Sequence, residues 1–86
     1  MKHARKDYDR IQDPENLIPQ DEPVFLLRGQ DILAPSLLRE WADLLEEAGG
    51  SEEMAEMVRE HAHAMDDWQY KHKVKVPDLP KTQDNG

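Results

Sequence analysis

The chain has 86 residues, no cysteine and a formal net charge of −8, from 19 acidic and 11 basic side chains. A chain of this length forms one domain at most, and it has no disulfide to stabilise it. The negative charge opposes non-specific binding to nucleic acid, whose phosphates are also negative. A core this small is marginal by itself, so we expect self-association to contribute to stability.

Residues 1–13 are expected to form a basic N-terminal arm that is disordered, because charged, weakly apolar termini are seldom held in place. Its basic start, Lys2–Lys6, is followed by Tyr8, Asp9 and Arg10, where a signal peptide needs an apolar stretch. No segment reaches the length of a membrane span. We therefore expect a cytoplasmic protein without a membrane partner.

Residues 14–76 are expected to form a single small domain that opens with an extended segment, since Pro14, Pro19 and Pro23 forbid a regular helix there. The longest apolar run, Val24–Leu27, follows and contains the only phenylalanine. Between Pro23 and Gly29, this run predicts a strand over residues 24–28. A run this apolar should be buried, and truncating a buried Phe25 to alanine should cost about 3 to 5 kcal/mol.

A single strand needs a hydrogen-bonding partner. Three segments are candidates: residues 74–76, residues 8–11, or the same strand of another subunit. The sequence does not choose among them.

A helical hairpin is predicted after this strand. Pro35 suits a first helical turn, and apolar residues then recur every three or four positions, which predicts a helix over residues 35–48. Gly49 and Gly50 end it by permitting a left-handed turn. Ser51 is a suitable N-cap for a second helix over residues 52–71, with carboxylates in its first turn.

The second helix carries a row at heptad spacing, which we expect to pack on the first helix: Met54, Val58, His61, Met65, Trp68 and His72. Met57, Ala62 and Ala64 widen the apolar surface and leave room for a second copy, which predicts a dimer-based homo-oligomer. Val74–Val76 alternates like a short edge strand, and residues 77–86 are expected to be a disordered tail. The predicted fold is thus mainly α with a minor α+β component: one short strand, then a helical hairpin, between disordered arms.

The end of the predicted strand is the best candidate for a ligand site. Arg28, Gln30 and Asp31 flank the flexible Gly29, where a chain leaving a core can present polar groups to a ligand. One arginine with backbone donors can hold a phosphate despite a negative net charge. Two further candidate ligand-binding residues are Trp41 and His61.

Each of these residues also has a purely structural interpretation. Asp31 would cap the following helix and Arg28 would pair with an acidic neighbour, as in an ordinary turn. Trp41 and His61 would serve as core or interface residues.

The second helix also contains a weak metal-binding pattern. Glu60 and His63 have the Glu-x-x-His spacing of ferritin-like sites, and a single row would include Glu56, Glu60, His63 and Asp67. An exposed charged helix face gives the same pattern. We assign no metal and no cofactor. The sequence contains no nucleophile elbow, P-loop, dinucleotide fingerprint or paired zinc motif, so we expect no enzyme.

The string DEPVFLLRGQD at Asp21–Asp31, followed by Ala34-Pro35, Leu38 and Trp41-Ala42, resembles a pattern found in short proteins of phage and prophage genomes. The resemblance covers about a third of the chain and brings no assigned chemistry. It implies a phage protein acting in the host cytoplasm. In size and design, the chain is similar to viral proteins that block host immunity, some of which sequester cyclic-nucleotide signals in pockets between subunits.

Three functions therefore stand as hypotheses. The first is a homo-oligomeric anti-defence protein that sequesters a small anionic ligand, a nucleotide-type immune signal. The second is an interaction module that docks on a host or phage protein and inhibits it. The third is a ferritin-like metal-binding protein.

Overall fold

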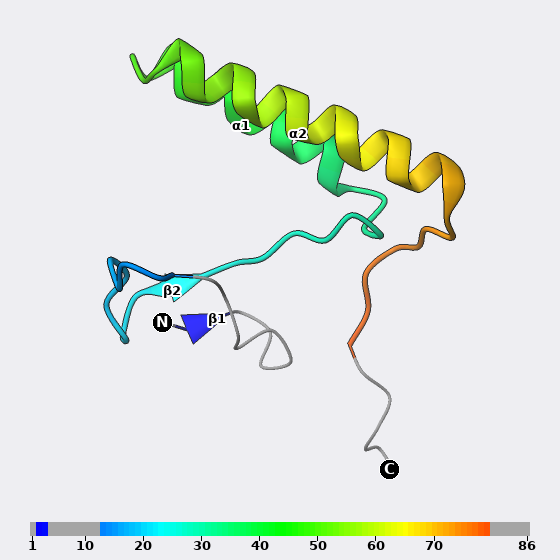
Figure 1. Cartoon of the computed structure of the whole chain (residues 1–86), viewed down its shortest axis with the longest axis horizontal. Coiled ribbons are helices and arrows are strands. Elements are labelled where there is room, and N and C mark those ends of the chain that lie inside the picture. The colour runs from blue at the N-terminus through cyan, green and yellow to red at the C-terminus, as the bar shows by residue number, and fades with distance from the viewer. Residues whose placement is uncertain (1, 4–12, 80–86) are drawn as a thin grey trace. The chain divides into compact units, whose positions relative to one another are not determined.

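The computed structural model describes residues 2–3 and 13–79. The chain divides into two compact units, Met1–Leu26 with Asp78–Gly86, and Leu27–Pro77. In chain order the elements are strand β1 (Lys2–His3), strand β2 (Pro23–Val24), helix α1 (Ala34–Glu47) and helix α2 (Glu52–Lys71) (Figure 1). The fold is mainly helical, as predicted. Most of the predicted N-terminal arm and of the predicted tail lies outside the described residues.

The first unit contains a short parallel pair of strands. Lys2 lies opposite Pro23 and His3 opposite Val24. The predicted strand over residues 24–28 is therefore wrong in extent, because β2 ends at Val24 and residues 25–28 form no regular element. Its partner, β1, is none of the three candidate segments. The expected burial of Phe25 is also wrong within one copy, since this side chain is 63% exposed.

The helical hairpin of the second unit is confirmed, with each helix end within one residue of its predicted position. Pro35 lies in the first turn of α1. The left-handed turn is at Gly49, whose φ is 82°. The N–H of Gly49 donates to Glu46 O at 3.0 Å and that of Gly50 to Leu45 O at 2.8 Å, which satisfies two of the last carbonyls of α1. A Cβ at Gly50 would overlap Leu45, so this turn requires glycine at both positions.

The helix α2 begins as its sequence predicts. Ser51 Oγ accepts a hydrogen bond from Met54 N at 3.1 Å, and Glu52 and Glu53 occupy the first turn. A hydroxyl at this position satisfies one of the amides that have no partner within the helix.

The seam between α1 and α2 is built from small side chains. The fully buried residues are alanines: Ala34 and Ala42 on α1, and Ala55 and Ala62 on α2. Among the described residues no large side chain is fully buried. The predicted row is therefore only partly right: Val58 and Met65 are half-buried beside the alanines, but Met54, His61, Trp68 and His72 are exposed and lie outside the packing seam of α2. The seam lies one position further along the chain, because alanines let two helices approach more closely than methionine or tryptophan would.

Ion pairs mark one face of the hairpin. Arg59 lies 2.6 Å from Glu46 and 2.8 Å from Asp43, and Arg39 pairs with Asp66. Arg59 is only 28% exposed, so its guanidinium lies within this cluster. These contacts link α1 to α2 along one side of the alanine seam.

The opposite side of the seam is apolar. Residues advance by about 100° around a helix, so Leu37 and Trp41 lie on the other side of Ala42 from Asp43. By the same rule, Met54 and Trp68 lie on the other side of Ala62 from Arg59. We call this side the apolar face; it comprises six large, partly exposed side chains, Leu37, Trp41, Leu44, Met54, Met57 and Trp68.

Candidate functional site

The loop that leads into α1, residues 27–33, is shaped by Asp31. Its Oδ1 accepts a hydrogen bond from Leu33 N at 2.8 Å, and its carbonyl accepts one from Ala34 N at 3.0 Å. The carboxylate thus closes a local turn directly before the helix, whose N-cap residue, Leu33, provides no side-chain hydrogen bond. The predicted capping role of Asp31 is therefore wrong: Asp31 lies two residues before the N-cap position and shapes the turn that leads into the helix.

Two distant parts of the chain fix this loop. Ile32 N donates to Lys75 O and Lys75 N donates to Gln30 O, each at 3.1 Å. The predicted edge strand at residues 74–76 thus pairs with this loop, through a parallel bridge between Asp31 and Lys75, and not with residues 24–27. From α2, Gln69 Nε2 donates to the carbonyls of Gly29 and Asp31, both at 2.9 Å. These bonds hold the loop beside the C-terminal half of α2.

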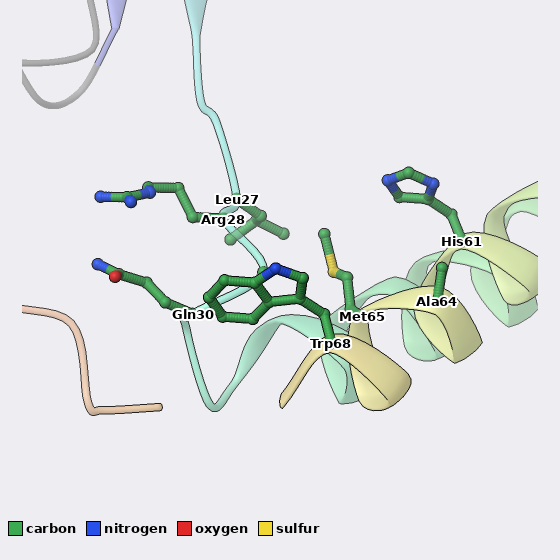
Figure 2. Close-up of a pocket in the computed structure, with 8 residues that line it drawn as sticks. Leu27, Arg28, Gln30, His61, Ala64, Met65 and Trp68 are labelled. Atoms are coloured by element: carbon green, nitrogen blue, oxygen red, sulfur yellow. The ribbon is translucent and has the colours of Figure 1, made fainter. Parts of the chain in front are cut away.

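An open pocket of about 350 Å³ lies between the loop and α2. Its lining consists of Leu27, Arg28, Gly29, Gln30, His61, Ala64, Met65 and Trp68 (Figure 2). Four of the six predicted ligand-binding residues meet here: Arg28, Gly29, Gln30 and His61. Asp31 shapes the turn before α1 instead, and Trp41 is on the apolar face and does not line the pocket.

Trp68 provides the main apolar surface of the pocket and is 41% exposed. Gly29 packs on it: a Cβ at this glycine would lie 3.7 Å from the indole. The His72 ring stacks on the indole, with ring centroids 4.0 Å apart, and His72 Nδ1 lies 2.7 Å from Trp68 O. The indole is therefore held in a defined orientation.

Sequence reasoning placed Trp68 in the seam, and it overlooked Leu27, Ala64 and Met65 as pocket residues. One signal was available, because Trp68 follows His61 by seven residues and two full turns bring both to the same side of α2. The loop residues were predicted, but their place beside Trp68 could not be anticipated, since it depends on hydrogen bonds from Gln69 and Lys75.

The polar groups of the pocket lie at its two ends. Figure 2 shows Arg28 and Gln30 extending away from α2 at one end and His61 at the other, with Trp68 and Met65 between them. A planar group can stack on the indole while an anionic group meets the guanidinium. The amide of Gln30 adds both a donor and an acceptor.

The predicted metal row does not converge. Among residues 2–3 and 13–79, no three His, Asp or Glu side chains are grouped so that they could hold a metal ion. Glu56 lies 3.2 Å from Arg59, and His63 lies 3.7 Å from Asp67 on an exposed surface. The same part of the chain contains no helix with the length and apolar character of a membrane span.

Comparison of the chain with protein-family models, with curated proteins and with solved structures finds no match. The candidate site therefore rests on its own geometry.

Proposed function

We propose that this chain is a non-enzymatic binding protein whose pocket takes a small planar ligand with an anionic group, of nucleotide type. The observation that carries the proposal is the meeting of Arg28, Gln30 and Trp68 around one pocket. Arginine binds phosphate oxygens through two parallel N–H groups, and an indole stacks on any nucleobase.

The size of the pocket limits the ligand. Small-molecule sites in proteins range over about 300 to 1,000 Å³, and this pocket of about 350 Å³ is near the lower end. It suits one nucleotide unit. Since the pocket is open, one copy covers only part of such a ligand.

The wider role follows from assembly. The thin alanine core and the exposed apolar face support a dimer-based homo-oligomer. Together with the resemblance to phage proteins, this favours sequestration of a nucleotide-type immune signal in the host cytoplasm. In this role the protein lowers the free concentration of the signal and performs no reaction.

Calorimetry against a panel of linear and cyclic nucleotides tests the proposal. We expect one or more to bind, with at least a tenfold loss of affinity in Trp68→Ala and in Arg28→Gln. Tyr70→Ala is the matched control, because Tyr70 is an aromatic residue of α2 that is 91% exposed and outside the pocket lining. If none of the nucleotides binds to the folded oligomer, the proposal is wrong.

A second function, docking on a host or phage protein, is favoured by the apolar face. Large apolar side chains at a surface are typical of protein interfaces. If this is the function, a single stoichiometric partner should co-purify with the wild type and be lost in Leu44→Glu. Glu40→Lys should retain it, because Glu40 belongs to neither face. A partner retained by Leu44→Glu would contradict docking through this surface.

A further inference from the structure

The apolar face leaves large side chains exposed that a small domain usually buries. Within the hairpin the buried residues are four alanines and Pro35, while methionine, leucine and tryptophan remain partly exposed on the apolar face. Side chains of this size normally supply most of the burial energy of a domain. A partner with a similar apolar face would bury them, and a second copy of the hairpin offers one.

Charge is distributed unevenly along the hairpin. Between Leu44 and Val58, at the turn, the chain has five carboxylates and no basic residue. The open end has three lysines between Trp68 and Pro77, against two carboxylates, Asp66 and Asp67, directly before them. Two copies joined with turn beside turn would place the carboxylates together. Two copies joined with turn beside open end place opposite charges together, which is favourable.

We propose that two copies pair through their apolar faces in antiparallel orientation, and that Met54 and Met57 of one copy cover the open pocket of the other. The inference rests on the proposed binding function and adds the part of the pocket that one copy lacks. The occupant of the apolar face is thus a second copy of this chain.

The spacing along α2 gives the register. Met54 precedes His61 by seven residues and Trp68 follows it by seven, so all three lie on one side of the helix. An antiparallel pair of α2 helices centred on His61 therefore brings Met54 against the partner's Trp68. Thioether sulfur packs well at the edge of an aromatic ring, and here it would shield the pocket from water. On α1, Leu37 and Leu44 flank Trp41 in a similar way.

Disulfide formation tests the orientation, since the chain contains no cysteine. Under mild oxidation we expect His61→Cys to give a cross-linked dimer, because position 61 meets its own copy at the symmetry axis. A mixture of Met54→Cys and Trp68→Cys proteins should give the mixed dimer. Glu40→Cys, exposed on α1 outside the apolar face, is the matched control and should stay uncross-linked. No more cross-linking in His61→Cys than in this control would overturn the antiparallel arrangement.

Nucleotide binding by a monomeric variant tests the contribution of the partner. Leu44→Glu should sediment as a monomer and bind the nucleotide found in the panel at least tenfold more weakly than wild type. Circular dichroism verifies its helices, and Trp41→Glu provides a second variant if the first fails to fold. Unchanged affinity in a folded monomer would overturn the role of Met54 and Met57. If His61→Cys cross-links but no nucleotide of the panel binds, the antiparallel dimer is supported and the proposed nucleotide-binding function is wrong.

Discussion

Gln69 supports the pocket, although it does not line it. Its amide nitrogen donates to two carbonyls of the loop, those of Gly29 and Asp31. We expect Gln69→Ala to lower the free energy of unfolding by about 1 to 3 kcal/mol, since each hydrogen bond contributes about 0.5 to 1.5 kcal/mol. Amide exchange at Ile32, which donates to Lys75 O, should become faster. Glu60→Ala, an exposed change on the same helix, should alter neither quantity, and unchanged exchange in Gln69→Ala would contradict the role of Gln69.

Phe25 contributes little burial to one copy of the protein. Its ring is 63% exposed, so its truncation removes little burial within one copy. We expect Phe25→Ala to change the free energy of unfolding by less than about 0.5 kcal/mol, as surface substitutions usually do. Urea unfolding measures this, and a loss near 3 kcal/mol would restore the earlier expectation of a buried ring.

The Arg59 cluster gives the hairpin a dependence on pH. The hydrogen bond from Arg59 lowers the pKa of Glu46 below its ordinary value of 4.5. A carboxylate with a lowered pKa in the folded state adds stability that is fully present above its ordinary pKa and lost as the pH falls through the lowered one. We therefore expect the melting temperature to fall more steeply below about pH 4.5 in wild type than in Glu46→Gln.

Glu47→Gln is the control for this titration. Glu47 is exposed and forms no ion pair with any other described residue. Its removal should leave the steep fall of the melting temperature below about pH 4.5 unchanged. If the melting temperatures of Glu46→Gln and wild type fall equally with acid, the Arg59 cluster does not contribute to the pH dependence of stability.

At the scale of the helices, the alanine seam limits side-chain size. Ala62 has no exposed surface, and α1 packs directly against it. We expect Ala62→Leu to lower the free energy of unfolding by about 1 to 3 kcal/mol, because the added carbons must push the helices apart. Ala64→Leu, two residues away and exposed, should be tolerated by the fold. Equal stability of the two variants would place the seam elsewhere.

The ends of the helices could be predicted because the signals for them are local. Pro35, Gly49 and Ser51 each act within one turn of the chain, and all three have their expected roles. The seam could not be predicted in the same way. Both the alanine row and the methionine and tryptophan row of α2 have helical periodicity, and periodicity alone does not tell which row the partner helix contacts.

The site could likewise be predicted only where its signals are local in the sequence. Arg28, Gly29 and Gln30 could be found from a glycine that follows an apolar run. Trp68 could be seen as important, but its place beside Gly29 depends on bonds between residues some 40 positions apart, such as that from Gln69 to Gly29. Contacts over such separations leave no pattern in a single sequence.

For the whole molecule, folding and assembly should be coupled. A dimer is favoured by mass action, so the melting temperature of the wild type should rise with protein concentration. The melting temperature of Leu44→Glu should be lower and independent of protein concentration, because a charge on the apolar face prevents association. Glu40→Lys should behave as wild type. A concentration-independent midpoint for the wild type would contradict the coupling.

The uneven charge along the hairpin has an electrical consequence. The backbone dipoles of α1 and α2 run in opposite directions and largely cancel. The side-chain charges do not cancel, because carboxylates gather near the turn and lysines near the open end. A single copy is therefore a permanent dipole along its helices, but its net charge of −8 makes two copies repel at long range, so the dipole only favours the antiparallel orientation once they are close. In the antiparallel pair the two axial moments are equal and opposite, so they cancel and the pair has no axial dipole with which to orient a third copy.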